Sequence, residues 1–133
     1  MEESAWGSRS CGALCILSTA RCQAAGVKLL VALLPTKENV FWSRVRNPDS
    51  FPELRRIVAD EERLKQELVA DLRSHRIDYV DLLTALRTAP AQPYYEDVDG
   101  HPNAVGQRVI AATVAERLSE GRPLNGDSFT APS

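Results

Sequence analysis

The chain has 133 residues, a formal net charge of −2, 44% apolar residues and 26% charged residues. This length suits one domain of common size, and the composition is ordinary for a globular protein. The small net charge gives no strong attraction to nucleic acid or anionic lipid, and no apolar run is long enough to span a membrane. We therefore expect a soluble chain that binds no nucleic acid and has no membrane span.

The N-terminal segment, residues 1–23, becomes helix-like in composition from about Gly12 to Ala25, and Gly26 suits the C-terminal cap of that helix. Three cysteines fall here with no histidine or fourth cysteine nearby, which indicates neither a disulfide framework nor a zinc site: Cys11, Cys15 and Cys22. The apolar run CGALCILSTA is a weak candidate for a secretion signal, because acidic residues precede it and its cleavage site is poor. We expect a cytoplasmic protein, with a secreted or periplasmic location as the alternative.

A nearly unbroken apolar run, VKLLVALLP, is bounded by Gly26 and Pro35. Such a run predicts a strand that is buried on both faces, as in a parallel sheet. The following residues, TKENVFWSRV, predict a loop that enters a short helix. Phe41 and Trp42 in that helix are expected to pack against apolar neighbours, although an aromatic ring near a pocket could also contact an acyl or sugar group.

The longest helical pattern covers residues 50–76, and Ser50 and Glu53 have capping-box spacing at its start. His75 lies at its end, where the helix dipole favours a cation. Residues 77–82, IDYVDL, predict a second and shorter strand, and a short helix follows over residues 82–87. The apolar face of the long helix is expected to comprise Ile57, Leu64, Leu68 and Leu72.

Beyond two prolines, YYEDV predicts a few extended residues, and Asn103 is placed to cap a final helix that runs to about Leu118. The alternation of strands and helices predicts an α/β domain of three layers, helix, parallel sheet and helix, over residues 24–120, with a flexible tail at 121–133. Two strands are few for such a sheet, so an incomplete domain is expected. The inner side of the final helix is expected to hold Val105, Val109, Ile110 and Ala112.

The tripeptide Asp99-Gly100-His101 is the strongest candidate for chemistry, because loops beyond the carboxyl ends of strands gather functional groups in such domains. An imidazole whose tautomer is set by a carboxylate can act as the general base for a serine hydroxyl. Two other interpretations stay open. Asp99 could simply cap a turn, or it could bind a metal with Asp97 and His101, although Gly100 and Pro102 argue against a regular strand and no fourth ligand is evident. No cofactor is expected.

Three stretches together resemble SGNH/GDSL-type hydrolases. YYEDVDGHPNAVGQRVIAATVAERL resembles the last conserved block of that superfamily, in which D-x-H or D-x-x-H followed by Asn and Gly opens the closing helix. GVKLLVALLPTKENVF resembles a strand and loop of the branch related to alginate O-acetyltransferases, in which an apolar strand runs into Pro-x-Lys. LRSHRIDYVDLLTAL fits the strand and helix between those blocks. The resemblance covers about Ala24 to Leu118.

The resemblance implies an SGNH hydrolase-like fold over residues 24–120 and an acyl-ester hydrolase or O-acetyltransferase acting on a small-molecule or carbohydrate ester. His101 would be the general base and Asp99 its orienting partner, and Lys37 of Pro-x-Lys would border the pocket. The family's nucleophile lies in a Gly-Asp-Ser motif, and no such block precedes Val27. NGDSF offers Ser128 instead, in the order that permuted relatives use, but the segment before it is not strand-like.

The sequence therefore predicts a fragment of an esterase or acyltransferase domain whose nucleophilic serine is not convincingly present. The alternative is a non-catalytic, truncated remnant that acts as an interaction module. An absent half-sheet would leave an apolar edge, which predicts self-association through that edge.

Overall fold

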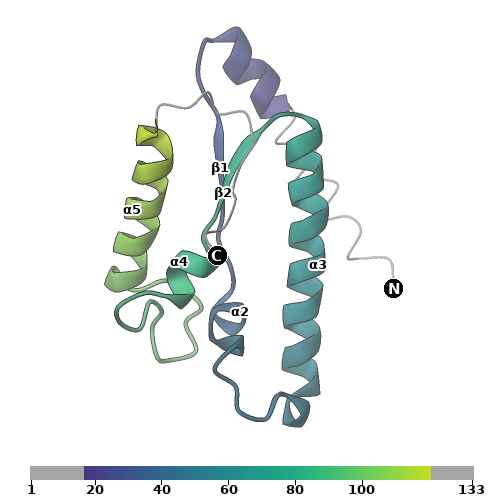
Figure 1. The fold of residues 1–133 in the computed structure, drawn as a ribbon, viewed down its shortest axis with the longest axis vertical. Helices are drawn as coiled ribbons and strands as arrows, with labels where there is room; N and C mark the ends of the chain where they lie inside the picture. The colour runs from purple at the N-terminus through teal and green to yellow at the C-terminus, as the bar shows by residue number, and fades with distance from the viewer. Residues whose placement is uncertain (1–16, 121–133) are drawn as a thin grey trace. The chain divides into compact units, whose positions relative to one another are not determined.

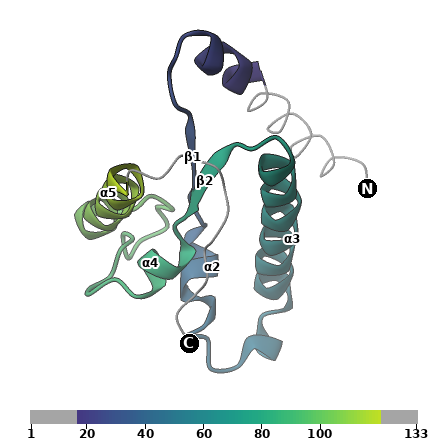
Figure 2. The same ribbon diagram turned by 45° about the horizontal axis from the view of Figure 1, so that its top comes forward.

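The computed structural model describes residues 17–120 (Figures 1 and 2). These residues form two compact units: one combines residues 17–31 with 66–79, and the other combines residues 32–65 with 80–120. The expected order of helix, strand, helix, strand and helix is present, starting with a helical segment at residues 17–24. The expected flexible tail, together with Cys11 and Cys15, lies outside the described residues.

The two expected strands are β1 (Leu30–Leu33) and β2 (Asp78–Asp81), and they pair in a small parallel sheet. The prediction that β1 is buried on both faces is wrong. Ala32 is exposed and the other three residues of β1 are only half-buried. A parallel strand loses both faces to the core only where layers cover both sides of a wide sheet, and β1 has a single hydrogen-bonded neighbour, β2, among the described residues.

Two helices of the first unit end in a local reversal of the chain. The helix at residues 17–24 ends at Gly26, which has a φ of 68°, and the N–H of Val27 donates to the carbonyl of Cys22 at 2.8 Å. This is the expected glycine cap, because a left-handed φ has no steric cost for glycine. The C-terminal part of α3 (Pro52–Ser74) ends in the same way, with Arg76 at a φ of 54° and the N–H of Ile77 donating to Leu72 at 2.8 Å.

The second unit contains α2 (Lys37–Trp42), a 3-10 turn (Pro48–Ser50), the N-terminal part of α3, α4 (Leu83–Arg87) and α5 (Ala104–Ser119). Helix α4 packs against both α2 and α5. Their facing apolar side chains make the core of the unit, which comprises Val40, Leu82, Leu83, Leu86 and Tyr94, with Phe41, Val80, Val109 and Ile110 packed against it. The predicted packing role of Phe41 is confirmed.

Local signals located the helices well, but the buried face of two helices differs from the expectation. In α3, Ile57 is 50% exposed whereas its neighbour Val58 is 5% exposed, so the inward face is rotated by one residue there. In α5, Ala112 is exposed. The expected extended run YYEDV forms no strand, and Tyr94 makes an isolated antiparallel bridge to Pro102. No helix in residues 17–120 is long and apolar enough to cross a membrane.

Candidate functional site

The loop between Tyr94 and α5 brings Asp99 and His101 into direct contact. The N–H of Asp99 donates to Oδ1 of Asp97 at 2.8 Å, and the N–H of His101 donates to Oδ1 of Asp99 at 3.0 Å. Both are bonds from an aspartate to the backbone two residues on, which turn the chain without any distant partner. The same Oδ1 atom of Asp99 also contacts Nδ1 of the His101 ring. One carboxylate oxygen therefore holds both the backbone and the ring of His101.

The electrostatics of this pair favour an ionised Asp99 carboxylate, and the contact of that carboxylate with Nδ1 selects one tautomer of the His101 ring. The hydrogen bonds from the ring and the backbone N–H of His101, together with the charges of His101 and Lys37, hold the pKa of Asp99 below its ordinary value. A carboxylate can only accept, so it favours the tautomer of His101 whose proton is on Nδ1. Nε2 then carries the free lone pair. The His101 side chain is 83% exposed, so the ring is open to an incoming hydroxyl group.

The loop is tied to the segment that follows β1 by Lys37. This residue is in the first turn of α2, after Pro35 and the N-cap Thr36. Its Nζ atom donates to the backbone carbonyl of Tyr95 and, at 2.6 Å, to that of Asp97. The Asp99–His101 pair thus lies on a loop attached to the chain beyond the carboxyl end of β1, the region where α/β domains place functional groups.

Tyr94 and Asn103 hold the two ends of the same loop. The hydroxyl of Tyr94, a residue that is 1% exposed, donates to the carbonyl of Pro35 at 2.7 Å. The side-chain oxygen of Asn103 caps α5 by accepting from the N–H groups of its second and third residues. Its amide nitrogen donates to the carbonyls of Gln92 and Tyr94 at 2.8 and 3.0 Å. The predicted cap is confirmed, and it also closes the base of the loop.

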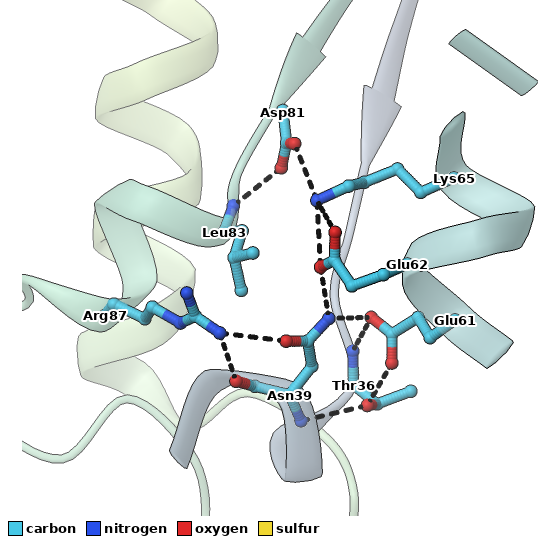
Figure 3. A network of polar contacts seen from close by, with 8 residues as sticks. All are labelled: Thr36, Asn39, Glu61, Glu62, Lys65, Asp81, Leu83 and Arg87. Atoms are coloured by element: carbon cyan, nitrogen blue, oxygen red, sulfur yellow. Dashed lines mark hydrogen bonds and ion pairs between the residues drawn. The ribbon is translucent and has the colours of Figure 1, made fainter. Parts of the chain in front are cut away.

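A polar network around one buried asparagine, called the buried network below, joins α2, α3 and α4 (Figure 3). Its centre is Asn39, which is 1% exposed. The amide of Asn39 donates to Glu61 and Glu62 at 3.1 and 2.8 Å, and its side-chain oxygen accepts from Arg87 at 3.0 Å. Glu61 in turn accepts from the backbone N–H and the hydroxyl of Thr36, the residue before Lys37. The network therefore anchors the start of α2.

The same network continues to the carboxyl end of β2 through Lys65. Its ammonium group bridges Glu62 at 3.0 Å and Asp81 at 3.1 Å. Burial raises the pKa of Glu62, but the hydrogen bonds of Asn39 and Lys65 and the charges of Lys65 and Arg87 outweigh this and lower it overall. Burial likewise lowers the pKa of Lys65, but its two carboxylate partners outweigh this and raise it overall. The ionised forms of Glu62 and Lys65 are thus favoured, as a charge-paired structural network requires.

The other candidate residues of the sequence are not part of this loop or lie outside the described structure. Ser128 lies outside the described residues. His75 follows the C-terminus of α3, where its ring contacts the carbonyl of Asp71 and the hydroxyl of Ser74, both at 2.9 Å. Trp42 is half-buried at the end of α2. In residues 17–120, no group of three or more histidine, cysteine, aspartate or glutamate residues is arranged to hold a metal ion.

The sequence did not predict the contact of Lys37 with the loop or the buried network around Asn39. The resemblance placed Lys37 at the border of a pocket, and the Pro-x-Lys pattern was the signal for it. Nothing in the local sequence marks Asn39 as buried, because an asparagine in a short polar helix is ordinarily exposed.

Comparison with known families gives one match over almost the whole chain. The model of the SGNH hydrolase-like domain of the acetyltransferase AlgX matches residues 4–131. No significant match was found among curated proteins or among solved structures.

Proposed function

The chain belongs to the SGNH hydrolase-like domain family of the acetyltransferase AlgX, and on this basis we propose that Asp99 and His101 are the acid–base pair of an acyl-ester hydrolase or O-acetyltransferase. At the coarser level the chain is a domain of the acetyltransferase and hydrolase type. The observation that carries the finer proposal is the Asp99 carboxylate, which contacts the Nδ1 atom of an otherwise open His101 ring.

In the proposed reaction, Nε2 of His101 takes the proton of a hydroxyl group as its oxygen attacks the acyl carbonyl carbon. The new C–O bond forms a tetrahedral intermediate, and its collapse breaks the ester C–O bond while Nε2 returns the proton to the leaving oxygen. Asp99 keeps the ring in the required tautomer and stabilises the imidazolium without taking the proton. The carboxylate must be ionised for this, and the lowered pKa of Asp99 is consistent with that requirement.

The proposed substrate is an ester of a small molecule or a carbohydrate, with O-acetyl groups as the first candidate because the matched family model is that of an acetyltransferase. The proposed nucleophile is Ser128, because NGDSF repeats the Gly-Asp-Ser order that SGNH hydrolases use. This residue lies outside the described structure, so its assignment rests on the motif alone.

The test is the hydrolysis of p-nitrophenyl acetate by the purified full chain and by matched histidine variants. His101→Gln and Asp99→Asn are expected to lower kcat/KM by about 10²- to 10⁴-fold, the usual contribution of general acid–base catalysis. His75→Gln removes the other of the two histidines and should leave the rate unchanged. It is the control for hydrolysis by any exposed imidazole. Equal rates for all three variants and the parent chain would refute the catalytic role of the pair.

The nucleophile is tested separately with a fluorophosphonate that labels activated serines, followed by mass spectrometry of the labelled peptide. Labelling at Ser128 that disappears in Ser128→Ala and in His101→Gln would support the assignment. Labelling at another serine would transfer the role to that residue and leave the Asp99–His101 pair in place.

A non-catalytic interaction module is the second candidate function. It is favoured by one observation: in residues 17–120, the hydrogen-bonded partner of the His101 ring is Asp99, and no serine hydroxyl contacts that ring. Absence of both turnover and fluorophosphonate labelling would favour this second function.

A further inference from the structure

Lys37 is in an unusual place for a lysine that serves only solubility or helix stability. It is the first residue of α2, at the positive end of the helix dipole, where a cation gains nothing and an acid is preferred. Its ammonium group instead reaches the carbonyls of Tyr95 and Asp97, which are 58 and 60 residues away in the sequence. The local structure of α2 therefore does not explain Lys37, whereas the contact with the distant loop does.

The residues that flank Lys37 in the chain are held by the buried network. Thr36, directly before it, is bonded through its backbone N–H at 3.1 Å and its hydroxyl to Glu61 of α3. Asn39, two residues after it, is bonded to the same glutamate, to Glu62 and to α4. Because its flanking residues are held and its ammonium group makes two contacts, Lys37 connects the buried network to the loop.

On the loop side, two short steps separate the Lys37 contact from the imidazole. Asp97, whose carbonyl accepts from Lys37, uses its own side chain to accept the N–H of Asp99 at 2.8 Å. Asp99 then holds both the backbone and the ring of His101. A displacement of residue 97 would therefore be passed directly to the carboxylate that orients the ring.

Apolar burial does little to hold the middle of this loop. Val98 is 106% exposed and Tyr95 is 47% exposed, so neither side chain is packed into the core. Tyr94 and Asn103 fasten only the two ends of the loop. Lys37 contacts the part of the loop between those ends, at the carbonyls of Tyr95 and Asp97.

We infer that Lys37 is a positioning residue, which clamps the carbonyls of residues 95 and 97 so that Asp99 holds the His101 ring in the orientation and tautomer needed for proton transfer. The inference rests on the proposed function for its catalytic meaning, but its structural content is measurable without any substrate. Two positive results support it from the geometry alone: the double carbonyl contact and the short chain of hydrogen bonds to the ring.

The test is long-range ¹H–¹⁵N correlation NMR of the two histidine rings in the full ¹⁵N-labelled chain, at a pH where both are neutral. In the parent chain, His101 should show the Nδ1–H tautomer. In Lys37→Met, which keeps the stem and removes the donors, at least half of that population should be lost, while His75 serves as the internal reference and stays unchanged. Lys37→Arg, which retains donors, should preserve most of it, and Lys28→Met is the matched control at an exposed lysine.

The outcomes separate this inference from the proposed function. An unchanged His101 tautomer in a folded Lys37→Met chain overturns the positioning role and leaves the Asp99–His101 pair intact. Loss of the tautomer in Lys37→Met without any esterase turnover in the parent chain supports the positioning role while the proposed function fails. If Lys37→Met does not fold, the ammonium protons of the parent chain decide: Lys37 should exchange with water more slowly than Lys28, and equal exchange overturns the clamp.

Discussion

Replacement of Asn39 by alanine tests whether the buried network holds the start of α2. The substitution removes three side-chain hydrogen bonds: two from the amide to Glu61 and Glu62, and one accepted from Arg87. Hydrogen bonds to charged groups contribute roughly 1.5–3 kcal/mol each, which sets an upper limit of about 4.5–9 kcal/mol.

The partners of Asn39 are not left fully unpaired, so the expected loss is smaller than that limit. Glu61 keeps its bonds from Thr36, and the side chain of Glu62 is 34% exposed to water, which can replace a lost donor. Arg87 keeps its bond to the backbone carbonyl of residue 39 at 2.9 Å. We therefore expect Asn39→Ala to lower the free energy of unfolding by about 2–4 kcal/mol.

Urea denaturation followed by circular dichroism measures this loss. With an m-value of roughly 1–3 kcal/mol per M, a loss of about 3 kcal/mol lowers the midpoint by about 1–3 M. Asn47→Ala is the matched control, because Asn47 is exposed and makes no side-chain capping bond, and it should change stability by less than about 0.5 kcal/mol. A loss of less than about 1 kcal/mol in Asn39→Ala would refute the idea that this network anchors α2.

Two further predictions concern the residues that close the loop. Gly106→Ala should lower the melting temperature, because a Cβ at this position would overlap the carbonyl oxygen of Pro93. Gly100→Ala should leave the melting temperature unchanged, because nothing lies within 4 Å of a Cβ placed there. Equal melting temperatures for the two variants would contradict the close packing at Gly106. Burial, with the charges of two nearby glutamates, raises the pKa of Tyr94 to about 12, so the stability it contributes is complete below the unfolded pKa near 10 and is lost as the pH rises toward 12. Tyr94→Phe should cost about 1–2 kcal/mol at neutral pH and should weaken that alkaline loss, as measured by urea unfolding from pH 9 to 12.

Much of the fold could be predicted because the signals are local. The glycine cap at Gly26 and the asparagine cap at Asn103 depend on the chemistry of three or four adjacent residues, and both are present. The contact between Asp99 and His101 is also local, since two turns of the aspartate type bring residues two positions apart together. The inward phase of α3 was misjudged because the packing partner decides whether Ile57 or Val58 faces the core.

What the sequence determined by itself is thus the order of the elements, the caps at Gly26 and Asn103, and the local pairing of a carboxylate with an imidazole. Tertiary structure alone decided which residues hold that pair in place. Lys37 meets the loop across 58 and 60 residues, and Asn39 meets Arg87 across 48 residues. Contacts of such separation leave no periodic or neighbouring pattern in the chain, because they exist only once packing has brought the two segments together.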